Sequence, residues 1–210
     1  MDYEKLRREL VEKLEKLGYI GNEEVKKAML KVKRELFVPR YLKRVAYEDR
    51  PLPIPAGQTI SAPHMHAMML TELRLKKGMK VMEIGAGSGI LLAYMKEIVG
   101  ERGKVIGLEI VKEVYEFAIK NLKESGYYGK VELILKDGKE GYEEEAPYDR
   151  IVSSAAARKI PSSWKEQLKD GGILITPVER FGWQELILLE KKGNKYMTEK
   201  ICPVSFVPLV

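Results

Sequence analysis

The sequence has few of the residues that form disulfides or bind metals. Of its 210 residues, one is cysteine, Cys202, and two are histidine, His64 and His66. A single cysteine excludes an internal disulfide framework and a thiolate metal cluster. Two histidines in one short motif, with no partner cysteines, also disfavour a zinc site. We therefore expect no metal.

Long apolar runs are absent as well. No stretch approaches the ~18 to 20 apolar residues of a membrane-spanning helix, and the opening MDYEKLRREL is too charged for a signal peptide. Hydrophobic residues make up 45% and charged residues 32%, which is typical of a globular protein. The length suits one hydrophobic core. We expect a cytoplasmic, single-domain protein over 1–210 with no membrane partner, comprising a helical segment (1–79) and a catalytic core (80–210).

Asparagine and glutamine occur only three times each, whereas lysine and glutamate are abundant, a balance that indicates a thermophilic source. The net charge is +6, and residues 26–44 hold eight Lys or Arg against Glu35 alone. Such a span can attract nucleic acid, but at helical spacing a solvated surface is the favoured interpretation.

The N-terminal third is predicted to be helical. A leucine stripe predicts a first helix that ends at Gly18, and Asn22 is a good N-cap for a second helix that stops before Pro39. A third helix is expected from a cap at Ser61 to Leu73. Prolines force an extended, irregular connection before it: Pro51, Pro53 and Pro55.

From Lys80 onward, apolar strands alternate with helices, which predicts a doubly wound α/β sheet, mostly parallel. The expected strands are Lys80–Ile84, Lys104–Glu109, Val131–Leu135, Asp149–Ser154, Gly172–Pro177, Glu185–Glu190 and Lys195–Pro203. The expected helices are Gly89–Val99, Val111–Ser125 and Pro161–Lys169. The last two strands have no helix between them and should form an antiparallel hairpin.

An acidic, glycine-rich turn, EIGAGSG, follows the first of these strands and opens a helix. Its glycines, Gly85, Gly87 and Gly89, permit tight backbone conformations and close approach of a ligand. A dinucleotide fingerprint would need a small residue at position 90, where Ile90 stands. The turn therefore disfavours a nicotinamide cofactor.

The same turn resembles the first motif of class I S-adenosyl-L-methionine-dependent methyltransferases, which have a Rossmann-like sheet. The resemblance implies that Glu83 serves the amino acid portion of the cofactor. Glu109 ends the next strand, where a carboxylate can accept hydrogen bonds from both ribose hydroxyls. Asp137 and Gly138 follow the third strand, where this class contacts adenine; a simple Asp-Gly turn is the alternative.

The segment GQTISAPHMHA, Gly57 to Ala67, gives the most specific resemblance. With DRPLPIPA before it, and EIGAGSGIL, QLKDGGILITPV, WQEL and FVPL after it, the chain resembles the protein-L-isoaspartate (D-aspartate) O-methyltransferase family. The resemblance implies that Ser61 is the active-site serine; a plain helix N-cap is its alternative role. It also implies cofactor contacts from Gln58, Thr59, Ile60, Ser61 and His66, and peptide contacts from Val207, Pro208 and Leu209. His64 and the nearby methionines are left out of the site.

Two positions depart from the family pattern: Arg158 stands where proline is usual, and the chain ends at Val210, soon after the FVPL segment. The implied reaction transfers a methyl group to the free α-carboxylate of L-isoaspartyl residues, with D-aspartyl residues as a further candidate. Because carboxylates are ionised at neutral pH, with pKa values near ~3.5 to 4, no general base is needed. Damaged proteins and peptides are then the partners, nucleic acid is not expected, and the enzyme should be a monomer.

Three alternatives remain at this point. A class I methyltransferase acting on RNA shares the cofactor fold, and the basic span favours it. Its usual motifs are missing, however, since no Asn/Asp-Pro-Pro-aromatic sequence occurs and Cys202 lies too near the C-terminus for a pyrimidine-attacking thiol. A basic binding module without catalysis and a nicotinamide oxidoreductase are the others.

Overall fold

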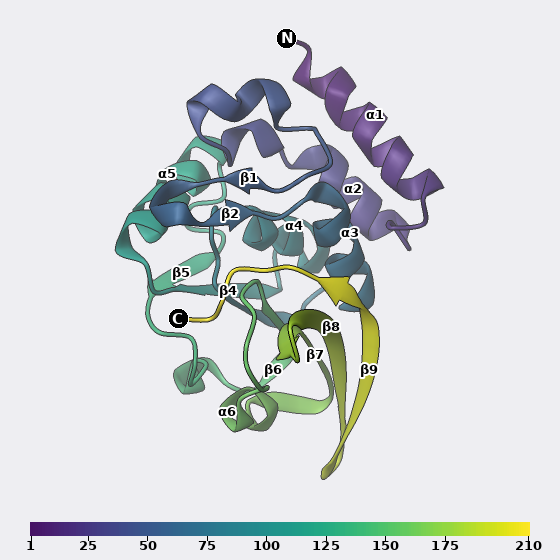
Figure 1. Cartoon of the computed structure of the whole chain (residues 1–210), viewed down its shortest axis with the longest axis vertical. Coiled ribbons are helices and arrows are strands. Elements are labelled where there is room, and N and C mark those ends of the chain that lie inside the picture. Colours follow the sequence, from purple (N-terminus) through teal and green to yellow (C-terminus); the bar gives the residue numbers. More distant parts are fainter.

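The computed structural model describes all 210 residues and contains one seven-stranded sheet in the order β5-β4-β3-β6-β7-β8-β9 (Figure 1). The strands are β3 (Lys80–Ile84), β4 (Lys104–Glu109), β5 (Glu132–Leu135), β6 (Tyr148–Ser153), β7 (Leu168–Arg180), β8 (Trp183–Lys192) and β9 (Lys195–Val204). Strands β5, β4, β3, β6 and β7 run parallel to one another, and β8 is antiparallel to its neighbours β7 and β9. The expected mostly parallel sheet with a C-terminal hairpin is confirmed; β7 extends the hairpin to three antiparallel strands.

Alternate residues of the central strands belong to two separate cores. Val81 joins a core of 37 buried residues, whereas Met82 joins a smaller one of 11. Successive side chains of a strand point to opposite faces, so each face of the sheet has its own core. Figure 1 shows α4 (Ile90–Val99) and α5 (Lys112–Ser125) above the sheet and α6 (Ser162–Glu166) below it.

Three N-terminal helices form a further layer: α1 (Tyr3–Lys16), α2 (Glu23–Lys31) and α3 (Pro63–Glu72). The predicted Asn22 cap is confirmed, since its side chain accepts a hydrogen bond of 3.0 Å from the Val25 N–H. The buried faces of these helices, including Leu14 and Met29, belong to the larger core. That core therefore runs without interruption from the N-terminal helices to the sheet.

The second helix is shorter than predicted. It ends at Lys31, Val32 is extended, and separate 3-10 turns follow at η1 (Arg34–Leu36) and η2 (Arg40–Val45). The break turns the Arg34 side chain inward, where it is 1% exposed and donates 2.8 Å hydrogen bonds to the Ala46 and Ser61 carbonyls. These distant partners account for the early end of the helix.

Three other expectations are corrected. The third helix begins at Pro63 with Ala62 as its cap, so Ser61 is not an N-cap; the first-turn N–H of His64 instead donates to Asp49 Oδ1 at 2.9 Å. The predicted Pro161–Lys169 helix is shorter, because Leu168 already belongs to β7. The proline-rich connection is partly regular: β1 (Leu52–Pro53) pairs with β2 (Thr59–Ile60) around η3 (Pro55–Gly57).

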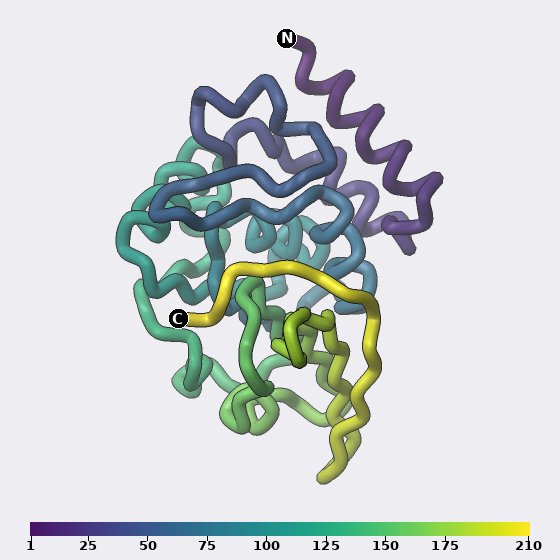
Figure 2. The backbone as a smooth tube through the Cα atoms, in the orientation of Figure 1, coloured from purple at the N-terminus to yellow at the C-terminus, as the bar shows by residue number.

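The last residues of the chain cross the top of the sheet. Figure 2 shows this yellow segment running between the blue β1–β2 hairpin and the green strands. Ala156 fixes its path: the Ala156 N–H donates to the Val207 carbonyl and the Leu209 N–H donates to the Ala156 carbonyl, both at 2.8 Å. The N-terminal segment and the C-terminal tail thus meet over the carboxyl ends of the parallel strands.

Candidate active site

A pocket of about 750 Å³ opens where strands β3, β4, β5 and β6 end. Strand β3 lies between β4 and β6, so the chain leaves it in opposite directions, which creates a crevice at the carboxyl edge. We call this the strand-end pocket. Its lining includes most of the residues that the sequence singled out: Gln58, Thr59, Ile60, Ser61, His66, Glu83, Gly85, Gly87, Glu109, Asp137, Gly138, Val207, Pro208 and Leu209.

Gly89 is the one predicted site residue outside this lining. It is the N-cap of α4, with φ at +83°, and a Cβ there would lie 3.3 Å from Leu122. Glycine at this position lets α4 start close to α5, and a contact of Gly89 with the cofactor stays a prediction.

Most backbone N–H groups of the glycine-rich turn are hydrogen-bonded within the protein. The Gly85 and Ala86 N–H groups donate to the Leu108 carbonyl at 2.8 and 3.0 Å, and the Gly89 N–H donates to Ala86 at 2.9 Å. The Gly87 N–H donates to Glu109 Oε2 at 2.9 Å. A phosphate-binding loop instead presents free N–H groups to its ligand. The turn therefore fits a ligand without phosphate.

Glu83 has the most unusual environment in the strand-end pocket. Its side chain is 1% exposed, and Oε1 accepts a hydrogen bond of 2.8 Å from Ser154 Oγ. Oε2 is buried and has no hydrogen-bond partner. Burial, with a contribution from Glu109, raises the pKa of this carboxyl well above its ordinary range. A cationic group in the pocket would satisfy Oε2 and favour the ionised carboxylate.

Glu109 is held firmly at the end of β4. Oε2 accepts from the Gly87 N–H at 2.9 Å, and Oε1 accepts from the Val111 N–H at 3.0 Å. Each carboxylate oxygen retains further acceptor capacity. The fixed carboxylate can therefore still receive two hydroxyl groups.

Asp137 and Gly138 form the wall beyond β5. Asp137 Oδ1 accepts from the Lys139 N–H at 2.9 Å, and the Gly138 carbonyl accepts from Trp164 Nε1 at 2.8 Å. A Cβ on Gly138 would lie 2.5 Å from Ile84 Cγ2. This close approach requires glycine at position 138, and the contact of the Asp-Gly pair with adenine stays a prediction.

Ser61 lies at the opposite side of the strand-end pocket. Its carbonyl is held by Arg34 Nη2 at 2.8 Å, whereas its hydroxyl makes no hydrogen bond within the protein. His66 is 4% exposed, and its Nδ1 lies 3.4 Å from Arg34 Nη1. Burial and the positive charge of Arg34 hold the pKa of His66 well below its usual 6.5. His66 is therefore neutral, with Nδ1 facing a donor and the proton on Nε2.

A second, more open cavity adjoins the first, and we call it the adjoining cavity. It shares Thr59, Ser61, Ser154 and Val207 with the strand-end pocket. The other residues that line it are Pro51, Ala62, His64, Met65, Pro203, Val204, Ser205 and Phe206. Ser61 and Ser154 therefore lie where a buried ligand and a larger substrate could meet.

Sequence reasoning missed Ser154 and His64, which line these cavities, and Arg34, which lines neither but holds the Ser61 carbonyl. Ser154 directly follows the parallel strand β6, so the strand-end rule that identified Asp137 also applies to it. Arg34 appeared only as part of a basic run and gave no separate signal. His64, which had been set aside, lines the adjoining cavity, where Asp49 Oδ1 lies 2.9 Å from its Nδ1.

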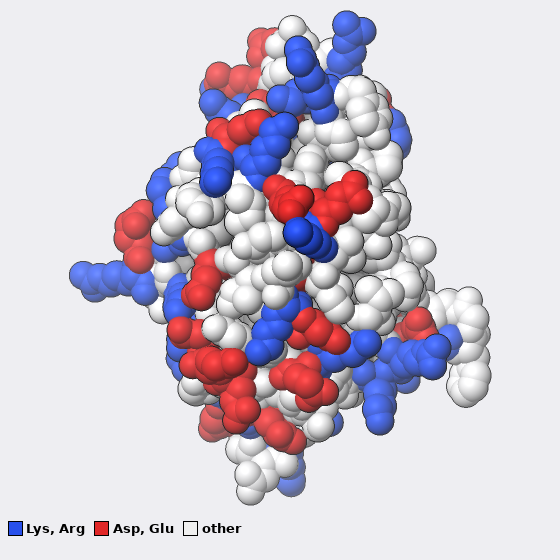
Figure 3. Space-filling model, turned by 90° about the vertical axis from the view of Figure 1, so that its left-hand side faces the viewer, with Lys and Arg blue, Asp and Glu red and all other residues white.

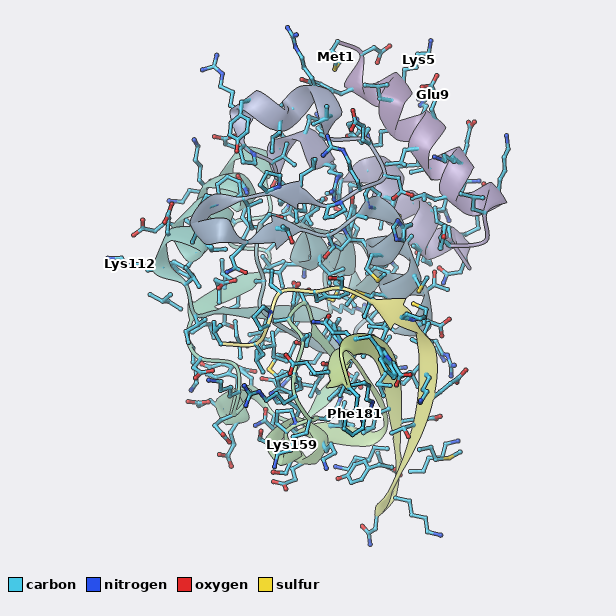
Figure 4. All side chains as sticks on the ribbon, viewed as in Figure 1. Met1, Lys5, Glu9, Lys112, Lys159 and Phe181 are labelled. Carbon is cyan, nitrogen blue, oxygen red and sulfur yellow. The ribbon has the colours of Figure 1, made fainter.

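The basic span does not form a continuous positive surface. Lys26 pairs with Glu15 at 2.8 Å and Lys31 with Glu97 at 2.7 Å, while Arg34 is buried. Figure 3 shows acidic and basic side chains interspersed over the face that it presents, and Figure 4 shows Lys5 and Glu9 projecting from α1 into solvent. These pairs agree with the solvated-surface interpretation, and the expectation that the protein does not bind nucleic acid stays a prediction.

No group of three or more His, Cys, Asp or Glu side chains is arranged to hold a metal ion. No helix has both the length and the apolar character needed to cross a membrane. Arg158 has a side chain that is 94% exposed, 3.9 Å from Glu179 at the surface, so this departure from the family pattern leaves both cavities untouched.

The sheet order, the glycine turn and the two buried acids together define a Rossmann-like methyltransferase that uses S-adenosyl-L-methionine. An S-adenosylmethionine-dependent O-methyltransferase from Thermotoga maritima shares the fold, with a TM-score of 0.52 and 22% identity over 67% of this chain and 61% of that one. The model of the family described as protein-L-isoaspartate(D-aspartate) O-methyltransferase matches residues 4–210. The chain belongs to this family.

Individual relatives agree with this assignment. A protein-L-isoaspartate O-methyltransferase of Ignicoccus hospitalis is 48% identical over 99% of this chain and 98% of its own length. The one from Methanosarcina mazei is 50% identical over 99% and 84%. The crystal structure of a Plasmodium falciparum protein-L-isoaspartate O-methyltransferase, in complex with S-adenosyl-L-homocysteine, has a TM-score of 0.88 and 32% identity, covering 97% of this chain and 98% of that one. The chain is thus an isoaspartyl methyltransferase whose cofactor is S-adenosyl-L-methionine.

Proposed function

We propose that Ser61 orients the free α-carboxylate of an L-isoaspartyl residue for methylation, and that the adjoining cavity receives the peptide around it. The observation that carries this proposal is the Ser61 hydroxyl, which has no partner in the protein and lies at the junction of the two cavities. A hydroxyl can donate one hydrogen bond to a carboxylate. D-Aspartyl residues present a comparable carboxylate and are included in the proposal.

Different residues of the strand-end pocket would bind different parts of the cofactor. The unpartnered Glu83 Oε2 would hold its ammonium group, Glu109 its ribose hydroxyls, and Asp137 the amino group of adenine. Backbone around Gly85, Gly87 and Gly138 gives the ligand close approach. Gln58, Thr59 and Ile60, at and just before β2, and His66 on α3 would cover it. When bound, the cofactor supplies an electrophilic methyl group.

No proton has to be removed from the attacking oxygen, because a carboxylate with a pKa near ~3.5 to 4 is already ionised at neutral pH. The environment of His66 supports this account: its Nδ1 faces Arg34, and its lowered pKa makes it a weak proton acceptor. What remains for the protein is to position the two reacting groups and exclude water. Ser61 thus acts through orientation.

The C-terminal tail contributes the far wall of the substrate site. Of the three expected peptide contacts, Pro208 has no N–H and the Leu209 N–H is already bonded to Ala156. The Val207 N–H makes no hydrogen bond within the protein, and Val207 borders both cavities. We therefore assign the main backbone contact with the peptide to Val207.

The test uses labelled S-adenosyl-L-methionine and two matched peptides, one with isoaspartate and one with normal aspartate. The expected result is labelling of the isoaspartyl peptide alone. Ser61→Ala should lower kcat for this peptide, whereas Ser162→Ala, an exposed serine on α6, should not. Equal labelling of both peptides would refute the assignment to repair, and an unchanged kcat for Ser61→Ala would refute the role of Ser61.

We further propose a heat-adapted, cytoplasmic monomer that folds as one domain and does not bind nucleic acid. Heat adaptation is supported by linked ion pairs, such as Lys80 and Lys104 sharing Glu145, with Lys104 also pairing with Glu132. The single free thiol suits the cytoplasm. Thermal unfolding, size-exclusion chromatography and RNA filter binding across a salt series test these points.

A further inference from the structure

We propose that Gln184 is a positioning residue that holds the C-terminal tail closed over the strand-end pocket and thereby sets how fast the demethylated cofactor leaves. Its side-chain Nε2 donates to the Phe206 carbonyl at 3.0 Å, and its Oε1 accepts from the Phe206 N–H at 2.6 Å. One carboxamide thus binds both backbone groups of a single residue, as a neighbouring strand would.

The contact between Gln184 and Phe206 lies where the pairing of β8 with β9 ends. Strand β9 ends at Val204, which is the last residue paired with β8, and its partner in the register is Gln184. Beyond that point the main-chain ladder stops, and the Gln184 side chain extends the pairing to Phe206. The sheet is continued by a side chain at the point where the tail turns toward the pocket.

The tail beyond Phe206 has few other attachments. Ala156 holds Val207 and Leu209 through two backbone hydrogen bonds of 2.8 Å. Phe206 and Leu209 contact the two cores but are only partly buried. A segment with few buried contacts opens at low free-energy cost, so losing the two Gln184 bonds should open it locally.

The same tail borders both cavities. Residues Val207 to Val210 line the strand-end pocket, and Ser205 to Val207 line the adjoining cavity. Gln184 lines neither, so it touches no reacting group and acts only through the tail. A ligand enclosed by this wall can leave faster when the wall opens.

The chain offers a matched control in Gln167. This glutamine binds a different loop in the same way: its Nε2 donates to the Glu140 carbonyl at 2.8 Å, and its Oε1 accepts from the Tyr142 N–H at 2.9 Å. A change of glutamine to glutamate at either site replaces the donor with an acceptor and sets it against a carbonyl oxygen. Only the change at 184 should affect the tail.

The experiment compares wild type, Gln184→Glu, Gln184→Met and Gln167→Glu as full-length chains. Two quantities are measured: amide hydrogen exchange of the C-terminal peptide that contains Phe206 and Leu209, and the dissociation rate of S-adenosyl-L-homocysteine. We expect both to rise about ten-fold or more in the two Gln184 variants, in line with the loss of two hydrogen bonds. Exchange in β3 and β4 should not change, and Gln167→Glu should leave exchange in the tail unchanged.

The proposal is overturned if exchange in the tail is unchanged, or if it rises while the dissociation rate stays at the wild-type value, which would make Gln184 merely structural. It is also overturned if both Gln184 variants lose exchange protection throughout the sheet, because Gln184 would then stabilise β8 rather than the tail. The measurement needs no methyl acceptor. Its outcome is therefore separate from the assignment of Ser61.

Discussion

Arg34 donates a hydrogen bond of 2.8 Å from Nη2 to the carbonyl of Ser61, across 27 positions of the chain. The same buried guanidinium reaches the Ala46 carbonyl through Nε and lies 3.4 Å from His66 Nδ1. Three parts of the N-terminal segment therefore converge on one side chain. The position of the Ser61 hydroxyl depends on a residue that touches neither cavity.

Arg34→Lys tests this dependence. Lysine keeps the charge but has a single nitrogen in place of the planar guanidinium, so it cannot reach all three acceptors. We expect a loss of unfolding free energy of about 1 to 3 kcal/mol and a lower kcat for the isoaspartyl peptide. Denaturant unfolding and peptide methylation measure the two effects. Arg40→Lys, on the 3-10 turn η2, is the control, and an equal effect of both substitutions would contradict the prediction.

Glu83→Gln should have opposite effects on binding and on stability. It removes the charge that faces the cofactor ammonium, and we expect binding to weaken by about 1.5 to 3 kcal/mol. The pKa of Glu83 is raised in the folded state, so the folded protein binds the proton more tightly than the unfolded one. The unliganded wild type therefore loses stability as pH rises above about 4.3, and the Gln variant lacks this loss.

Calorimetric titration and denaturant unfolding between pH 5 and pH 8 measure the two effects of Glu83→Gln. The stability of the variant relative to wild type should increase with pH. Glu113→Gln, in the first turn of α5, is the matched control and should change neither property. A constant difference in stability across this pH range would argue against a raised pKa.

Glu109→Ala should mainly weaken cofactor binding. The substitution removes the acceptor for the ribose hydroxyls and also frees the N–H groups of Gly87 and Val111. A loss of about 1.5 to 3 kcal/mol in binding free energy follows from charge-assisted hydrogen bonds of this kind. Titration calorimetry gives the value directly, and an unchanged affinity would remove Glu109 from the site.

His66→Asn should alter how stability depends on pH. Because the pKa of His66 is lowered in the folded state, its neutral form stabilises the protein above the unfolded-state pKa of about 6.5. This contribution is lost as pH falls below that value, so the advantage of wild type over the variant should shrink between pH 7 and pH 5. Unfolding at several pH values measures it. A constant advantage would mean that His66 is not held neutral.

The central strands could be predicted to the residue because their signals are local. Strands β3 and β4 have the predicted bounds: each is a short, mostly apolar run that ends at the ligand edge of the sheet. The strand-end rule then brought Glu83, Glu109 and Asp137 to one pocket. The alternation of strands and helices determined the parallel order.

The parts that could not be predicted depend on contacts between distant segments. The early end of α2 follows from the burial of Arg34 against Ala46 and Ser61, which no periodicity indicates. Ser61 satisfied the compositional rule for a helix cap, yet the helix begins at Pro63, and the distant Asp49 accepts from the His64 N–H. Gly89 belonged to the glycine pattern, but its close approach to Leu122 gave no signal in the sequence. Local patterns identified the residue types, and tertiary contacts determined their roles.

The hydrogen bonds within the glycine-rich turn have a thermodynamic consequence. Four of its amides, those of Gly85, Ala86, Gly87 and Gly89, are already bonded within the chain. The turn therefore has its binding shape before any ligand arrives, and little conformational entropy is lost there on association. Affinity at this edge of the sheet should therefore come mainly from the heat of a few polar contacts.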